Sequence, residues 1–224
     1  MPYSPRVLSL NVGKLRSLQV GGKVKQTGLF KQPMQGPQRI DENGLPGDNI
    51  VNRRFHGGPD QAVYLYSQDD IDWWKQQLQR DLEPGFFGEN LTITHWWPKV
   101  RVGDILQAGE LRIQITAPRP PCAVLAARVG DPAFVKQFIS AARCGAYARV
   151  LQPGSLNSGD QFHIMPATAA YPTVEDVFRS WHNKTQDADF LRRALAAPVA
   201  SLLRAALEER LLKAEASAAQ LSLL

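Results

Sequence analysis

Short apolar runs, interrupted by glycine, proline and asparagine, fill the first three-quarters of the chain. Alternating apolar and polar positions within such runs are typical of β-strands. We expect the last two strands to pair as a closing hairpin and residues 33–48 to form a loop. Many short strands separated by turns favour a mostly β fold, either a barrel or a sandwich. The predicted strands span residues 7–12, 23–27, 51–55, 62–66, 90–94, 104–107, 111–116, 146–151 and 161–165.

Helical spacing occurs at a few places between these strands. Ser67 is a suitable N-cap residue, and carboxylates follow it in the first turn, so a helix is expected from Ser67 onward. Two more helices are predicted, one beginning at Cys122 and one near Asp131, where a proline occupies the first turn.

The pattern changes to helical spacing beyond Pro166. Thr173 and Asp176 form a capping-box pattern, Asp187 begins a second helix, and leucines form a stripe from Ser201 to about Ala218. We therefore predict two domains, a β domain of residues 1–166 and a small three-helix domain of residues 167–224. The leucine stripe is interpreted as packing surface.

Charge is distributed unevenly between these two parts. The formal net charge is +5, and residues 1–167 hold 19 basic and 14 acidic side chains, whereas the remainder holds seven of each. The first part is therefore expected to bind an anionic ligand, and the balanced tail argues against DNA binding. Docking or dimerisation, as a homodimer, is the role expected for the tail.

Several classes are excluded on composition. No apolar run approaches the length of a membrane helix, and no signal peptide precedes the first strand. Two cysteines are too few for a disulfide framework, a zinc knuckle or an iron–sulfur cluster. A reduced, cytoplasmic protein is expected.

Cys122 is the leading candidate for chemistry. It ends the segment Ala117-Pro118-Arg119-Pro120-Pro121-Cys122, whose prolines make a stiff connector. The neighbouring Arg119 favours the thiolate, which is the form needed in a nucleophile or a soft metal ligand. The alternative is a buried cysteine that packs as a small hydrophobe. Cys144 is interpreted as structural.

A second group of candidates lies in the segment from Arg53 to Asp60. Arg54 and His56 share a face of the predicted strand, and Gly57-Gly58 lets a ligand approach the backbone. Asp60 is expected to accept a hydrogen bond from His56 or from turn amides. Together these groups suggest a phosphate or carboxylate cradle, although a hairpin turn with solvated arginines has the same pattern. Weaker candidates are Asn90, after Gly88-Glu89, and Lys14, after the first strand.

Five collinear segments resemble the MOSC family, the domain related to the C-terminal part of molybdenum-cofactor sulfurases. The similarity extends over residues 7–165 and is closest to YiiM-type members, which also carry a three-helix C-terminal extension. This chain has a second proline before the cysteine and arginines at positions 53 and 54, where lysines also occur. The segments are Gly44-Leu45-Pro46-Gly47-Asp48, His56-Gly57-Gly58-Pro59-Asp60, Phe87-Gly88-Glu89-Asn90-Leu91, Val102-Gly103-Asp104 and Pro118-Arg119-Pro120-Pro121-Cys122.

The resemblance implies a MOSC-type β-barrel with a few flanking helices that binds the molybdenum cofactor. Cys122 would ligate molybdenum, and Asn90 and Arg119 would line the pocket, with Lys14 as a further candidate. Arg54, His56, Gly57 and Gly58 would hold the cofactor phosphate.

The implied activity is reduction of N-hydroxylated compounds such as hydroxylaminopurine bases, with Asp60 or solvent as the proton source. Because the sequence has no dinucleotide-binding fingerprint and no cluster ligands, the electrons would come from an external reductase. The alternative is a non-catalytic carrier of the cofactor, or of sulfur on Cys122.

Overall fold

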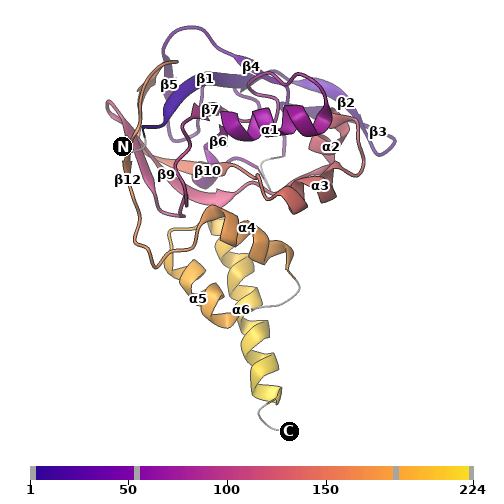
Figure 1. The fold of residues 1–224 in the computed structure, drawn as a ribbon, viewed down its shortest axis with the longest axis vertical. Coiled ribbons are helices and arrows are strands. Elements are labelled where there is room, and N and C mark those ends of the chain that lie inside the picture. The colour runs from indigo at the N-terminus through magenta and orange to yellow at the C-terminus, as the bar shows by residue number, and fades with distance from the viewer. Residues whose placement is uncertain (1–3, 53–55, 184–186, 222–224) are drawn as a thin grey trace.

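The computed structural model describes residues 4–52, 56–183 and 187–221. Its centre is an eight-stranded sheet in the order β12-β8-β9-β10-β6-β7-β1-β4, in which only β6 and β7 run parallel (Figure 1). Two more sheets have two strands each, β11-β5 and β2-β3. The strands are β1 (Arg6–Gly13), β2 (Arg16–Val20), β3 (Lys23–Thr27), β4 (Lys31–Pro33), β5 (Gln38–Ile40), β6 (Val63–Ser67), β7 (Leu91–Thr94), β8 (Ile105–Ala108), β9 (Leu111–Pro118), β10 (Ala146–Gln152), β11 (Gly154–Leu156) and β12 (His163–Met165).

The predicted barrel is not found as a closed ladder. The outer strands β12 and β4 do not pair with each other in the described part of the chain. Register shifts in β1 and β10 bend the sheet strongly, so that the segment before β12 approaches the start of β1. An isolated bridge, Arg6 to Gln161, joins the two there, with a hydrogen bond from the Val7 amide to the Asp160 carbonyl (2.9 Å). The fold is therefore a curled, mixed sheet with helices.

The predicted closing hairpin is also wrong. β10 lies between β9 and β6, whereas β12 pairs with β8. The intervening segment is not a simple turn, because it contains β11, which pairs with β5. β5 in turn lies inside the segment that was predicted to be a loop. Of the predicted strand 51–55, residues 51 and 52 are not in a strand, and 53–55 lie outside the described residues.

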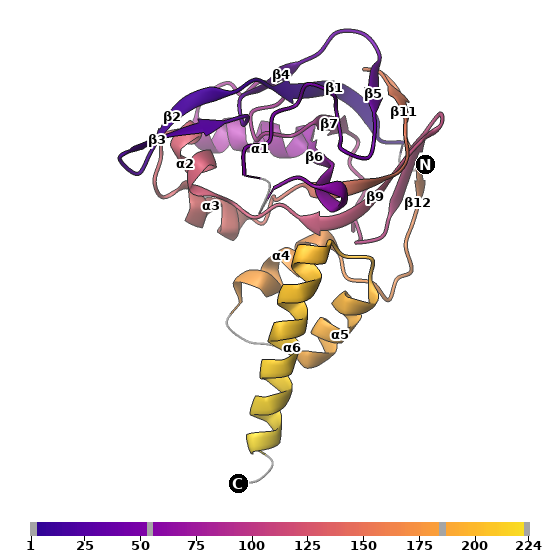
Figure 2. The ribbon, with the colours of Figure 1, turned by 180° about the vertical axis from the view of Figure 1, so that it is seen from behind.

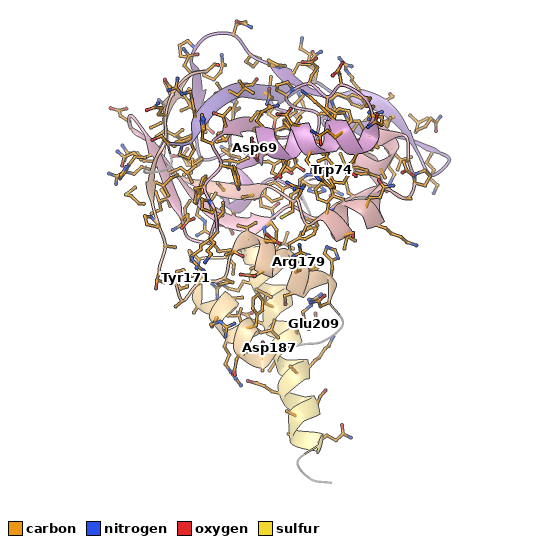
Figure 3. The ribbon with its side chains drawn as sticks, viewed as in Figure 1. Asp69, Trp74, Tyr171, Arg179, Asp187 and Glu209 are labelled. Carbon is orange, nitrogen blue, oxygen red and sulfur yellow. The ribbon has the colours of Figure 1, made fainter. Side chains whose placement is uncertain are left out.

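Three helices lie between strands of the sheet in the sequence: α1 (Gln68–Leu78), α2 (Ala123–Val129) and α3 (Phe134–Ala141). The Ser67 hydroxyl accepts a hydrogen bond from the Asp69 amide, which confirms the predicted N-cap. Trp74 of α1 is buried, and its ring packs 4.8 Å from Phe134 of α3, centroid to centroid. Figure 3 shows Asp69 and Trp74 at successive turns of α1 beside the sheet. This aromatic contact fixes α1 and α3 on the same side of the core.

The C-terminal segment contains α4 (Val174–His182), α5 (Ala188–Ala196) and α6 (Ser201–Leu221). Thr173 and Asp176 form the predicted capping box, and the Asp187 carboxylate caps α5. Figure 2 shows α6 running away from the sheet as a stalk, and Figure 3 places Asp187 and Glu209 on this part. No described helix is long and apolar enough to cross a membrane. The proposed domain boundary at residue 166 stays a prediction.

Asp104 joins the sheet to this C-terminal segment. Its carboxylate is buried and accepts hydrogen bonds from the Trp97 indole, the Arg101 amide and the Ala167 amide, each at 2.8 Å. Because all three partners are donors, the site needs a side chain whose polar atoms accept hydrogen bonds. The Val102-Gly103-Asp104 segment therefore has a structural role.

We expect Asp104→Asn to lower the free energy of unfolding by about 1–3 kcal/mol, because one amide donor would face other donors in a buried site. Urea denaturation measures the change. Asp72→Asn, at an exposed position of α1, is the matched control. A loss no larger than that of the control would contradict this role for Asp104.

Candidate functional site

A cavity of about 600 Å³ opens beside the β2–β3 hairpin. Its wall combines the end of that hairpin, the loop before η1 (Pro59–Gln61), and the connector between β9 and α2. The structure thus brings together segments far apart in the sequence. Five predicted site residues line it: His56, Gly57, Asn90, Arg119 and Cys122.

The other predicted site residues have different positions. Lys14 is exposed and is not among the lining residues. Gly58 follows Gly57 in the chain but does not itself line the cavity, and it adopts a positive φ of 83° that favours glycine. Arg54 lies outside the described residues, as does the strand face that it was predicted to share with His56. Asp60 is held elsewhere, as described below.

Arg119 is a buried cation with an unused donor. Its side chain stacks over Tyr64, 5.2 Å from guanidinium carbon to ring centroid, and only 4% of the residue is exposed. The Nη1 atom is buried and has no hydrogen-bond partner among the described residues. An arginine stays protonated inside a protein, and an unpaired buried donor is costly. The charge and the unpaired donor of Arg119 therefore favour an anionic or hydrogen-bond-accepting ligand in this cavity.

Cys122 is half-buried in the same wall, at the residue before α2. The described residues contain no group of three or more histidine, cysteine or carboxylate side chains placed to hold a metal ion. A metal at Cys122 would thus need to bring its other ligands within a cofactor. Cys144 differs, because it is buried and burial raises the pKa of its thiol.

His56 is neutral rather than cationic at physiological pH. Its Nδ1 atom lies 3.0 Å from the Tyr147 hydroxyl. Burial, aided by the charge of Arg119, lowers the pKa of His56 to about 4, and burial raises that of Tyr147 to about 12. His56 and Tyr147 therefore form a neutral hydrogen-bonded pair in the cavity wall. The histidine therefore brings no positive charge to the cavity wall.

A buried network that the sequence analysis did not predict supports the part of the cavity wall that contains Lys31 and Asn90. Lys31 forms an ion pair with Asp48, and Asn90 donates to the same carboxylate oxygen (2.9 Å). Asn90 also accepts from the Tyr64 amide (3.1 Å), and the Gly13 amide donates to Asp48 (2.8 Å). Burial lowers the pKa of Lys31 despite this partner. Asn90 is thus committed to protein partners and positions the wall around it.

The sequence carried a signal for only one member of this ion pair. Asp48 ends the Gly44–Asp48 segment quoted for the family resemblance, so its importance was visible but its partner was not. Lys31 has no local motif, and only the pairing of β4 with β1 places it beside Asp48. Long-range pairing of this kind cannot be obtained from local pattern.

Asp60 faces the C-terminal helices instead of the cavity. Its carboxylate accepts hydrogen bonds from the amide (2.8 Å) and hydroxyl (2.5 Å) of Ser201 and forms an ion pair with Arg149 (3.0 Å). Partial burial opposes its ionisation, but these partners outweigh burial, so the pKa of Asp60 is lowered. Asp60 does not line the cavity, and the predicted bond to His56 is absent among the described contacts. It connects η1 to the start of α6.

We expect Ser201→Ala to loosen the cavity loop, because it removes one of the two hydrogen bonds that hold Asp60. Loss of about 1 kcal/mol corresponds to about fivefold faster amide exchange where opening is local. Hydrogen exchange of the peptide containing residues 56–61 measures this effect. Ser217→Ala is the control, since that hydroxyl bonds only within α6. Equal exchange in both variants would show that α6 does not support the loop.

We expect His56 to make stability pH-dependent. The unfolded chain protonates this imidazole near pH 6.5, its usual pKa, whereas the folded protein does so near pH 4. Stability from this residue is therefore present above pH 6.5 and is lost as the pH falls toward 4. The difference in unfolding free energy between wild type and His56→Gln should change by about 1–2 kcal/mol between pH 7 and pH 5. A difference that stays constant over this interval would refute the assignment.

Comparison with known proteins identifies the family and the fold of the chain. The model of the MOSC domain matches residues 52–163, half of the chain. An uncharacterised protein, YflK, from Bacillus subtilis is 34% identical over 160 residues, which cover 71% of this chain and 72% of that protein. The crystal structure of YiiM from Geobacillus stearothermophilus has the same fold, with a TM-score of 0.76 and 23% identity, covering 92% of this chain and 99% of that one.

A third relative is longer than this chain. A protein named "Reductase" from Gibberella moniliformis is 28% identical over 210 residues, which cover 92% of this chain. The aligned part is only 37% of that relative. On the family match and the similarity to YflK, the chain belongs to the MOSC domain family, with the fold of its YiiM-type members.

Proposed function

We propose that the cavity binds the molybdenum cofactor, with Cys122 as the protein ligand to the metal, and that the protein reduces N-hydroxylated compounds. The observation that carries this proposal is the free Nη1 of Arg119 in a cavity wall shared with Cys122. A thiolate and a buried cationic donor three residues apart suit a soft metal bound within an anionic cofactor.

The polar atoms of the cavity fit such a group. Arg119 offers an unpaired donor, and the Gln61 Oε1 atom is a buried acceptor with no partner among the described residues. A pterin carrying a phosphate presents both complementary groups, since its ring has N–H donors and its phosphate has acceptor oxygens. Gly57 also lines the cavity, with a positive φ (85°) that favours glycine and with the Ile50 side chain 2.9 Å from where a Cβ would lie.

The residues of the cavity wall would then move the protons that the reaction needs. When bound, the molybdenum cofactor supplies two-electron chemistry that removes oxygen from an N–OH group. Reduction of R–NHOH to R–NH₂ and water also requires two protons. The Tyr147 hydroxyl and His56 form a neutral pair that can relay a proton within the cavity. We assign the relay to this pair rather than to Asp60, because the Asp60 carboxylate is held by Ser201 and Arg149.

Other observations agree with this function. The longer relative named "Reductase" supports an oxidoreductase role, although this chain aligns with only 37% of it. Both cysteines are free, which fits the reducing environment of the cytoplasm, and we place the protein there. A carrier of cofactor or sulfur is the alternative, because a half-buried thiol also suits transfer of a bound group.

We expect Cys122→Ser to lose bound molybdenum by at least about tenfold while melting as a folded protein, because a serine oxygen is a poor ligand for a soft metal. Cys144→Ala, at a buried position away from Arg119, is the control and should keep its metal. Metal analysis of protein purified from molybdate-supplied cells measures both variants.

Turnover then separates the enzyme from the carrier. Loaded wild-type protein with a chemical electron donor should convert an N-hydroxylated purine to its amine, and Cys122→Ser should not. Full metal content in Cys122→Ser would overturn the ligand assignment. Metal binding without turnover of hydroxylaminopurines, amidoximes or hydroxamates would favour the carrier.

A further inference from the structure

The positive charge of the chain is concentrated at its beginning. Residues 1–40 contain seven lysine and arginine side chains and no aspartate or glutamate. The positive charge of this segment is therefore larger than the net charge of the whole chain, which is +5. Lys31 is buried and paired with Asp48, so it does not contribute to the surface. Four exposed cations lie on or next to the β2–β3 hairpin: Lys14, Arg16, Lys23 and Lys25.

The hairpin presents three of these cations together. In its register Arg16 faces Thr27, Leu18 faces Lys25, and Val20 faces Lys23. Directly opposed residues point to the same side of an antiparallel pair, so Arg16, Lys23 and Lys25 share one face. Their exposed side chains form no ion pair among the described residues. We refer to Lys14, Arg16, Lys23 and Lys25 as the hairpin cations.

This basic surface adjoins the mouth of the cavity. Lys25 lines the cavity, together with the following Gln26 and Thr27. Figure 2 shows the hairpin beside α2, whose preceding residue is Cys122. One exposed apolar side chain, Val51 (52% exposed), lies in the cavity wall, whereas Val24 points to the other face of the hairpin. The surface therefore places positive charge and one apolar side chain next to the site of the proposed chemistry.

The positive potential continues beneath the hairpin. Arg16 and Arg128 both stack on Phe30, and Arg128 and Arg80 both stack on Phe86. Burial lowers the pKa of Arg128 to about 10. The negative charge of Glu89 opposes this lowering, and the positive charges of Arg16, Arg80 and Arg119 add to it. These arginines are held largely by aromatic rings and carbonyl groups rather than by exposed carboxylates. Their charge remains available to attract an anionic surface.

We propose that the hairpin cations form the docking surface for an acidic electron-transfer protein. This inference rests on the proposed function, in which each turnover needs two electrons: R–NHOH + 2e⁻ + 2H⁺ gives R–NH₂ + H₂O. The electrons come from the reduced flavin or iron–sulfur group of the donor, which is oxidised. The described residues hold no ligand cluster for an internal relay, so the donor's redox group must come close to the cavity mouth. A basic rim at that mouth matches an acidic partner and speeds its encounter.

The test compares a charge-reversed protein with a matched control. The double variant Arg16→Glu/Lys23→Glu reverses the charge of two hairpin cations that do not line the cavity. The single variant Lys23→Glu keeps the stacking of Arg16 on Phe30, so it reports the effect of charge even if the double variant folds poorly. Lys136→Glu, at an exposed position of α3, is the control. The probes are reduced flavodoxin and a reduced plant-type ferredoxin, both small acidic proteins, with reduced methyl viologen as a small cationic donor.

We expect the double variant to lose at least about tenfold in kcat/KM for the protein donors at low salt, with Lys23→Glu intermediate and Lys136→Glu unchanged. Wild-type kcat/KM should also fall as the ionic strength rises from about 20 to about 200 mM. Turnover with methyl viologen should be unaffected. Equal losses with methyl viologen and the protein donors would overturn the docking surface, because the cations would then act on the cavity itself.

Binding of the donors to the cofactor-free protein tests the surface without turnover. Titration followed by NMR should show weak binding of flavodoxin or ferredoxin to wild type and its loss in the double variant. If neither donor binds, or if binding survives in the double variant, the docking surface is wrong. Loss of affinity for a nucleic-acid duplex with donor binding intact would likewise overturn it. Donor binding that depends on the cations, in a protein without turnover, would support the surface and reject the proposed reductase.

Discussion

The site depends on one buried cation whose hydrogen bonds are incomplete. Arg119 lines the cavity and stacks on the Tyr64 ring, and its buried Nη1 atom has no hydrogen-bond partner among the described residues. In a region of low polarity such a group raises the energy of the empty protein, and an anionic ligand that accepts its hydrogen bond lowers it again. Burial, aided by the same charge, lowers the pKa of the neighbouring His56 and keeps it neutral. Prolines on either side of Arg119 hold its backbone, so the guanidinium cannot easily turn away to water.

Close backbone contacts complete the wall around that cation. A Cβ atom on Gly28 would lie 1.7 Å from the Asn49 carbonyl oxygen, and one on Gly13 would lie 1.9 Å from the Gly28 oxygen. Three segments therefore meet at distances that only glycine permits. The Asn49 side chain donates to the Gly13 carbonyl (2.9 Å) and ties two of them together. These contacts, with the ion pair of Lys31 and Asp48, fix one side of the cavity.

The sequence pattern correctly predicted the features that depend only on neighbouring residues. The caps at Ser67, Thr173 and Asp187 depend on side chains within three residues, and all were identified correctly. The proximity of Cys122, Arg119, His56 and Asn90 was found through the family resemblance and not through spacing. Pattern failed where partners lie far apart: β12 pairs with β8, and β5 lies in a segment predicted to be loop. It also misassigned Asp60, whose partner Ser201 is 141 positions away.

The contact between Asp60 and Ser201 has a consequence for the order of events during synthesis. Ser201 is synthesised 141 residues after Asp60, and later than every strand of the sheet. A nascent chain can form most of the sheet before this residue has left the ribosome, but the loop that follows His56 still lacks its anchor. The cavity then reaches its final form only after α6 has folded against η1. Any ligand of this cavity would therefore meet the complete binding wall only after the start of α6 has been synthesised.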